Sequence, residues 1–316
     1  MSVEREKVRT TNRFLERILL ATDGSEDAAL AGRVAVDLVR SSGAQLHIVH
    51  AWQAEIRRAY EVTLPVTLKE WCQQRAAELL AKEVKRIEEA GGEVTESHLV
   101  VGPPVDAILE LCEELDPALV IMGSRGLGPV GRIFVGSVSE GVVHHAHSPV
   151  LVVRGGAWAW PVRRVIVGMD FSEEARAAGE LASIIGKHYG ARGILVRAYP
   201  EIVHWAELQQ DQRETYERLL QNVLESEKRT LENCAAELGE LLGRPPEVEV
   251  SVGDATATIL KAADDEESTL IAVGSRGLGA TGRARLGSVS TKILRAARGP
   301  VLVFQHTAAG KGFDQD

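Results

Sequence analysis

The chain of 316 residues has 36 basic and 45 acidic side chains, and its formal net charge is −9 at pH 7. A general nucleic-acid binder needs a basic surface to displace counterions, so this charge balance disfavours that class. Hydrophobic residues make up 45% of the chain, but no run approaches the roughly 18 apolar residues of a membrane span, so no membrane role is expected.

The N-terminal segment and the cysteines favour a cytoplasmic location. Residues 1–13 are charged and lack the apolar core of a signal peptide, so export is not expected. The cysteines are odd in number and widely spaced, which favours neither a disulfide framework nor a zinc site; they are Cys72, Cys112 and Cys234. Residues 1–14 and 307–316 are predicted to be a flexible arm and a flexible tail.

In the first half, apolar runs typical of strands alternate with segments of helical periodicity. The run at 17–21 is followed by Ser25, a helix N-cap residue, and the next periodic segment ends at Gly43, a typical helix terminator. Strands that alternate with helices predict a parallel, doubly wound sheet. The predicted strands are 17–21, 45–52, 93–101, 118–122 and 149–153, and the predicted helices are 26–42, 67–90, 104–115 and 137–146.

The second half repeats the first. Gly123-Ser-Arg-Gly126, nine residues and Gly136-Ser137 recur 151 positions later, and the segment 18–26 matches 165–173. The fold class is therefore α/β, with two tandem, doubly wound, five-stranded parallel sheets of Rossmann-like type. The predicted domains are 15–154 and 162–306, with a linker at 155–161 whose tryptophans are expected to cover the domain junction. Further predicted elements are strands 164–169, 193–199 and 247–252 and helices 173–189 and 211–242.

The repeated glycine pattern indicates an anion site in each half. Glycines let a ligand approach the main chain, and each loop leads into a predicted helix, whose N-terminus favours a phosphate. Asp23 and Asp170 end the first strand of each half, where ligands of open parallel sheets bind. Each carboxylate could accept hydrogen bonds from ribose hydroxyls or a base while the loop faces phosphates.

The chain resembles the tandem form of the universal stress protein family, in its nucleotide-binding branch with the pattern Gly-x2-Gly-x9-Gly-(Ser/Thr). Both halves carry this pattern, and the resemblance covers residues 15–154 and 162–305. It implies one ATP per domain, with Mg²⁺ or Mn²⁺ on the phosphates and no metal ligand from protein side chains alone. The implied nucleotide-binding residues are Ala21, Thr22, Asp23, Ala51, Gly123, Arg125, Gly126, Gly136, Ser137, Val138 and Ser139, then Met169, Asp170, Ala198, Gly274, Arg276, Gly277, Gly287, Ser288, Val289 and Ser290.

The resemblance also implies roles for these residues. The Ser-Val-Ser segments that begin at Ser137 and Ser288 contact triphosphate and ribose, the aspartates face the nucleoside, and the two alanines lie on adenine. For Arg125 and Arg276, a phosphate contact and a solvated surface role both stay open. The aspartates could instead help to cap the following helices, and a glycine-rich turn can be purely structural.

The expected function is that of a nucleotide-dependent regulator in the stress response, acting on an unidentified protein partner. A slow metal-dependent ATPase and an ATP-independent interaction scaffold stay open, although the chain lacks the Walker pattern that places a lysine on phosphates. The esterase elbow Gly-x-Ser-x-Gly is also absent.

His144, His145 and His147 are interpreted as surface or packing residues. By the resemblance, the strands 150–153 and 301–304 are expected to pair within the chain, and dimerisation of chains is left open.

Overall fold

The computed structural model describes residues 15–53, 66–126, 135–155, 160–201, 210–263, 268–276 and 286–305. The chain divides into two compact units, which we call domain 1 (Met1–Gly156 with Gln305–Asp316) and domain 2 (Ala157–Phe304). The predicted arm and tail, Trp158 of the linker and Gly277 of the second glycine pattern lie outside the described residues.

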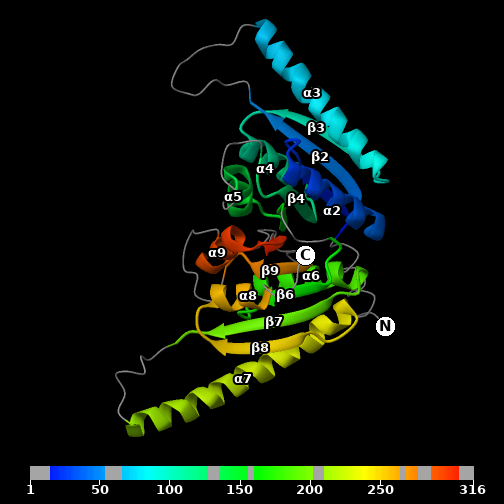
Figure 1. Ribbon diagram of the computed structural model, residues 1–316. Helices are drawn as coiled ribbons and strands as arrows, with labels where there is room; N and C mark the ends of the chain where they lie inside the picture. Colours follow the sequence, from blue (N-terminus) through cyan, green and yellow to red (C-terminus); the bar gives the residue numbers. More distant parts are fainter. Residues whose placement is uncertain are drawn as a thin grey trace, which may run out of the picture. The chain divides into compact units, whose positions relative to one another are not determined.

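Domain 1 contains a five-stranded parallel sheet in the order β3-β2-β1-β4-β5, of which β2, β3 and β4 are labelled in Figure 1. Helices α2 and α3 follow β1 and β2 and pack together on one face of the sheet, whereas α4 and α5 pack together on the other face. The elements are β1 (Arg17–Ala21), α2 (Glu26–Ser42), β2 (Gln45–Trp52), α3 (Val66–Glu89), β3 (Glu96–Val101), α4 (Pro104–Leu115), β4 (Leu119–Gly123), α5 (Ser137–His145) and β5 (Val150–Val153).

The two central strands of domain 1 read as continuous apolar runs because helices cover both faces of the sheet. Ile18 and Leu19 of β1 and Ile121 of β4 are fully buried. Helix α2 begins where predicted, since the Ser25 hydroxyl accepts a hydrogen bond from the Ala28 N–H at 3.2 Å, and it ends at Gly43 in the left-handed conformation. These signals fix the ends of α2 locally.

Domain 2 repeats this architecture, with the strand order β8-β7-β6-β9-β10 and all neighbours parallel. Its second helix, α7, is longer than its counterpart α3, with 33 residues against 24. The predicted fold class is confirmed. The elements are β6 (Arg164–Gly168), α6 (Glu173–His188), β7 (Arg192–Tyr199), α7 (Gln210–Leu242), β8 (Glu247–Val252), α8 (Ala255–Ala263), β9 (Thr269–Gly274), α9 (Ser288–Ala296) and β10 (Val301–Phe304).

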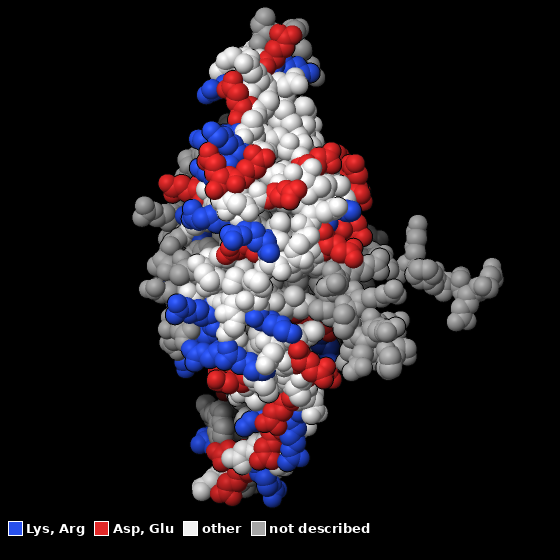
Figure 2. Space-filling model, turned by 90° about the vertical axis from the view of Figure 1, so that its right-hand side faces the viewer, with Lys and Arg blue, Asp and Glu red and all other residues white. Residues whose placement is uncertain are grey.

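Charged side chains of both signs are interspersed on the face shown in Figure 2. Elsewhere in the chain's helices, charged residues pair one helical turn apart, such as Lys85 with Glu89 in α3 (Val66–Glu89) at 3.6 Å and Arg229 with Glu225 in α7 (Gln210–Leu242) at 3.8 Å. Such exposed pairs contribute about 0.3–0.5 kcal/mol each. None of the described helices combines the length and the apolar character needed to cross a membrane.

The three thiols are expected to react at very different rates with iodoacetamide at pH 8. All are free; Cys112 and Cys234 are buried, and Cys72 is partly exposed. Burial raises the pKa of Cys112 to about 12 and also raises the pKa of Cys234. Because the thiolate is the reactive form, Cys72 should be alkylated at least about 100-fold faster than Cys112. Peptide mass spectrometry of a time course measures this, and similar rates at the two positions would contradict it.

Candidate functional site

A cavity of about 280 Å³ opens in domain 1 at the carboxyl ends of β1 and β4. The chain proceeds from β1 to β2 and β3 on one side of the sheet and adds β4 and β5 on the other, so the strand order reverses at this point. Every residue predicted for the first site lines the cavity. These are Ala21, Thr22, Asp23, Ala51, Gly123, Arg125, Gly126, Gly136, Ser137, Val138 and Ser139.

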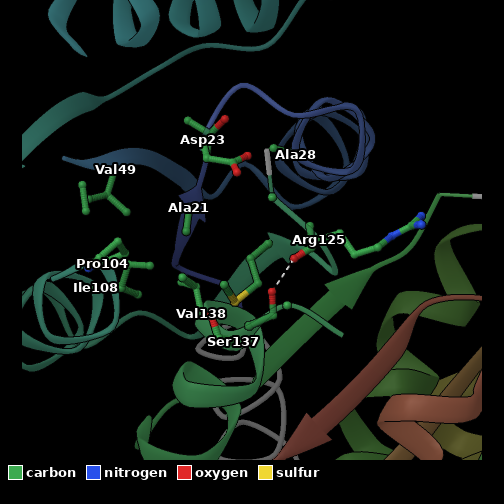
Figure 3. Close-up of a pocket in the computed structure, with 16 residues that line it drawn as sticks. Ala21, Asp23, Ala28, Val49, Pro104, Ile108, Arg125, Ser137 and Val138 are labelled. Atoms are coloured by element: carbon green, nitrogen blue, oxygen red, sulfur yellow. Dashed lines mark hydrogen bonds between the residues drawn. The ribbon is translucent and has the colours of Figure 1, made fainter. Parts of the chain in front are cut away.

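One wall of this cavity is apolar. Val49 from β2 and Pro104 and Ile108 from α4 gather on one side in Figure 3, and Met122 of β4 also lines the cavity. The sequence gives no sign of these four residues, because an apolar side chain in a strand or helix has the same pattern whether it lines a cavity or fills the core. An apolar wall of this kind suits the face of a planar ring.

The opposite part of the cavity is formed by the start of α5. Gly136 is the N-cap residue and makes no side-chain cap hydrogen bond, unlike Ser25 at the start of α2. The first N–H groups of a helix have no partner within the helix, and the helix dipole is positive there. The main chain of Ser137, Val138 and Ser139 therefore offers donors suited to an anion.

The second serine of each Ser-Val-Ser segment has a structural role that the sequence did not indicate. The Ser139 hydroxyl, which is buried, donates a hydrogen bond to the Gly123 carbonyl at 2.7 Å. Ser290 donates in the same way to the Gly274 carbonyl at 2.6 Å. These hydrogen bonds tie α5 to β4 and α9 to the strand that ends at Gly274. Each uses the one hydrogen that a serine hydroxyl can donate.

The glycines of the pattern serve different purposes. A Cβ on Gly123 would lie 2.7 Å from the Ala28 nitrogen, and one on Gly274 would lie 2.7 Å from the Ala175 nitrogen. The first glycine of the pattern therefore lets α2 pack closely on β4, and α6 on β9. A Cβ on Gly126 would instead lie 2.3 Å from Oδ2 of Asp23, so this glycine leaves room for a carboxylate.

Asp23 both supports the start of α2 and lines the cavity. Its Oδ1 accepts a hydrogen bond from the Ser25 N–H at 3.0 Å, which holds the turn before α2, while the residue lines the cavity. Asp170 in domain 2 accepts from the Ser172 N–H at 3.0 Å and from its hydroxyl at 2.5 Å. The helix-start role and the cavity-lining role are therefore compatible.

The Arg125 side chain forms an ion pair with Asp27 that the sequence did not indicate. Its Nε and Nη2 donate to the two carboxylate oxygens of Asp27 at 3.0 and 3.2 Å. The Ser124 hydroxyl and the Gly155 N–H donate to the same carboxylate at 2.7 and 3.0 Å. In Figure 3 the guanidinium extends away from the cavity, because this ion pair holds it.

Arg154 carries a second positive charge near Arg125. Burial and the charge of Arg125 lower the pKa of the Arg154 side chain.

Domain 2 has a corresponding cavity of about 430 Å³. Its apolar wall includes Val196 and Ile259, and Arg197 lines it as well. The predicted residues of the second site line it, apart from Gly277, which lies outside the described residues. They are Met169, Asp170, Ala198, Gly274, Arg276, Gly287, Ser288, Val289 and Ser290.

The two sites differ in charge and in backbone. No ion pair joins Arg276 to Glu174, the counterpart of Asp27, although both lie in the described part of the chain, and the Arg276 Nε is buried without a hydrogen-bond partner. Phe171 adopts φ = 66° where domain 1 has Gly24 at 77°, a conformation that costs a side chain about 1–2 kcal/mol. The Arg197 guanidinium lies 5.0 Å from the Phe171 ring centroid.

These features define a class: a tandem α/β protein in which each doubly wound domain presents a helix N-terminus and an apolar wall to one cavity. The family model described as the universal stress protein family matches residues 15–154 and again 161–305. The chain belongs to this family, and the resemblance inferred from the glycine patterns is confirmed.

The relatives include proteins of one and of two domains. Universal stress protein Rv2005c of Mycobacterium tuberculosis is 28% identical over 296 residues, which cover 90% of this chain and 96% of that protein. A universal stress protein of Thermus aquaticus is 37% identical over 141 residues, 45% of this chain and all of that protein. A crystal structure of a universal stress protein from Archaeoglobus fulgidus covers 92% of this chain and 98% of its own, with a TM-score of 0.64 and 23% identity. That structure supports the fold.

Proposed function

We propose that each domain binds one adenine nucleotide, with ATP as the ligand, and that occupancy regulates contacts with a protein partner in the stress response. The observation that carries this proposal is the combination, in both cavities, of an apolar wall, a carboxylate and the start of a helix without a side-chain cap. A nucleotide has a matching series of groups, namely a planar base, ribose hydroxyls and anionic phosphates.

The arrangement suggests an orientation for the nucleotide. In domain 1 the base would lie against Val49, Ala51 and Ile108, the ribose near Asp23, and the phosphates at the start of α5. In domain 2 the base would lie against Val196, Ala198 and Ile259, by the same logic. Mg²⁺ or Mn²⁺ would bridge the phosphates, and no protein side chain is assigned to the ion.

Binding without rapid hydrolysis fits the side chains of the first cavity. Among the described residues that line it, Asp23 is the single carboxylate, and neither lysine nor histidine is present. One oxygen of Asp23 already accepts from the Ser25 N–H. A general base must be free to take a proton from the attacking water, so we favour a nucleotide-gated regulator over an ATPase.

Mass spectrometry of small molecules released from the denatured protein, followed by calorimetric titration with ATP and Mg²⁺, tests the proposal. We expect two ATP per chain and no accumulation of ADP. Accumulating ADP would replace the regulator with a slow ATPase. The absence of both bound nucleotide and heat of titration would mean that the cavities are structural and the fold is an interaction scaffold.

Filling the space proposed for the base should remove one binding site at a time. We expect the Ala51→Leu variant to bind one ATP per chain, because the added side chain would occupy the ring position in domain 1. Ala198→Leu should have the same effect in domain 2, and the double variant should bind none. Val101→Leu is the matched control, since Val101 is 57% exposed on β3, and it should keep two ATP. Two ATP per chain in the double variant would contradict the proposed orientation.

A further inference from the structure

Two histidines and a glutamate lie close together on β2 and β3 of domain 1, away from the candidate nucleotide site. His47 of β2 pairs in register with Glu96 of β3, and His98 follows two residues later. Because residues two apart on a strand point to the same face, the three side chains share one face of the sheet. Among the described residues, this is the one group of three whose metal-ligating atoms lie within 4.8 Å of one another.

We propose that His47, Glu96 and His98 form a binding site for a divalent transition metal ion, with Zn²⁺ as the expected occupant. The His47 Nδ1 lies 3.1 Å from the His98 Nε2. Two nitrogens bound to one tetrahedral Zn²⁺ at about 2.0–2.1 Å lie roughly 3.3 Å apart. The distance between these two imidazole nitrogens is therefore close to the distance between two nitrogens that bind the same Zn²⁺ ion.

The glutamate completes a donor set that zinc accepts. Its Oε2 lies 3.9 Å from each of the two imidazole nitrogens. The Glu96 side chain is 61% exposed, so it can move toward an ion without disturbing the core. Two imidazoles and one carboxylate leave a fourth position for water, and imidazole ligands favour zinc, cobalt or nickel over magnesium or calcium.

A simple hydrogen bond between the rings is the competing explanation. At 3.1 Å, one ring can donate an N–H to the other, and this needs no carboxylate. That hydrogen bond does not account for Glu96, whose Oε2 lies equally far from both nitrogens and can complete a cation site. Burial of His47 and the positive charge of Arg17 on β1 oppose a positive charge at this position, while the charge of Glu96 favours one.

The cluster is separate from the candidate nucleotide site and is confined to domain 1. Ala51, which lines the cavity, follows His47 by four residues on the same strand, a distance of about 13 Å. An ion at the cluster would therefore not reach the phosphates, and it would join β3 to β2. In domain 2, Ile194 occupies the register position of His47 opposite Glu247, so one ion per chain is expected.

Titration of the full chain with Co²⁺ tests this site, using protein without a polyhistidine tag, stripped of metal and free of nucleotide. We expect one Co²⁺ per chain, with the visible absorption of a tetrahedral site, without a thiolate charge-transfer band, and displaced by Zn²⁺. The His98→Ala variant should bind at least about 100-fold more weakly, because disturbing only the outer partners of a metal ligand already costs 10–100-fold. Glu96→Gln, a change at an exposed side chain, should bind about 10-fold more weakly.

The His147→Ala variant is the matched control, since His147 is an exposed histidine outside the cluster, and its Co²⁺ affinity should be unchanged. Circular dichroism checks that each variant is folded. If the His98→Ala variant does not fold, the Glu96→Gln variant still decides the test. Unchanged affinity in Glu96→Gln, loss of binding in His147→Ala, a thiolate band, or no Co²⁺ binding by the unmodified chain would each overturn the proposal.

Discussion

The Asp27→Ala variant is expected to lose about 3 kcal/mol of stability in domain 1, because a buried carboxylate with four hydrogen bonds disappears. Its donors are the Ser124 hydroxyl, the Arg125 guanidinium, which donates twice, and the Gly155 N–H. Removing one partner of a buried ion pair costs about 3–5 kcal/mol. The lower end applies because the Arg125 side chain is 23% exposed and can be hydrated. Hydrogen-exchange mass spectrometry measures the loss in each domain separately.

Glu174→Ala is the matched control for this prediction. Glu174 occupies the same position at the start of α6, but it forms no ion pair with Arg276, although both lie in the described part of the chain. Its replacement should cost less than about 1 kcal/mol, the usual range for a substitution without a buried network. Equal losses of protection in the two variants would mean that the carboxylate of Asp27 does not hold the loop around Ser124 and Arg125.

The fold could be predicted because its signals are local. Caps and glycines delimit apolar runs, so the ends of α2, β2, α4 and β8 agree with the prediction. The start of β3 does not agree, since it was predicted at residue 93 and lies at Glu96. Thr95 explains part of this difference: its side-chain oxygen accepts a hydrogen bond from the Leu46 N–H at 3.1 Å in place of a regular ladder partner. Side-chain hydrogen bonds of this kind leave no periodic signal.

The site could be predicted only where the backbone demands a residue type. Glycine at positions 123 and 126 and a carboxylate at 23 follow from strand ends and tight approaches, and the sequence shows them. The Asp27–Arg125 ion pair joins residues 98 positions apart, and no periodicity indicates it. One available signal was that both halves have an acid at this position, Asp27 and Glu174.

Replacement of Gly126 should have a large effect on ATP affinity, an expectation that rests on the proposed nucleotide site. Gly126→Ala is expected to weaken ATP binding in domain 1 by about 10–100-fold, or roughly 1.4–2.8 kcal/mol. The new Cβ would lie 2.3 Å from Oδ2 of Asp23. That carboxylate cannot simply move aside, because its other oxygen accepts from the Ser25 N–H. Gly126 itself is exposed, so the fold should be preserved.

A double-mutant cycle with Asp23→Ala separates this explanation from a direct block of the phosphates. Calorimetry on four proteins, all carrying Ala198→Leu to silence domain 2, gives the coupling energy between the two positions. If Gly126 serves to accommodate the carboxylate, adding Gly126→Ala to Asp23→Ala should cost less than about 0.5 kcal/mol more. Additive losses would assign the glycine to the approach of the phosphates instead.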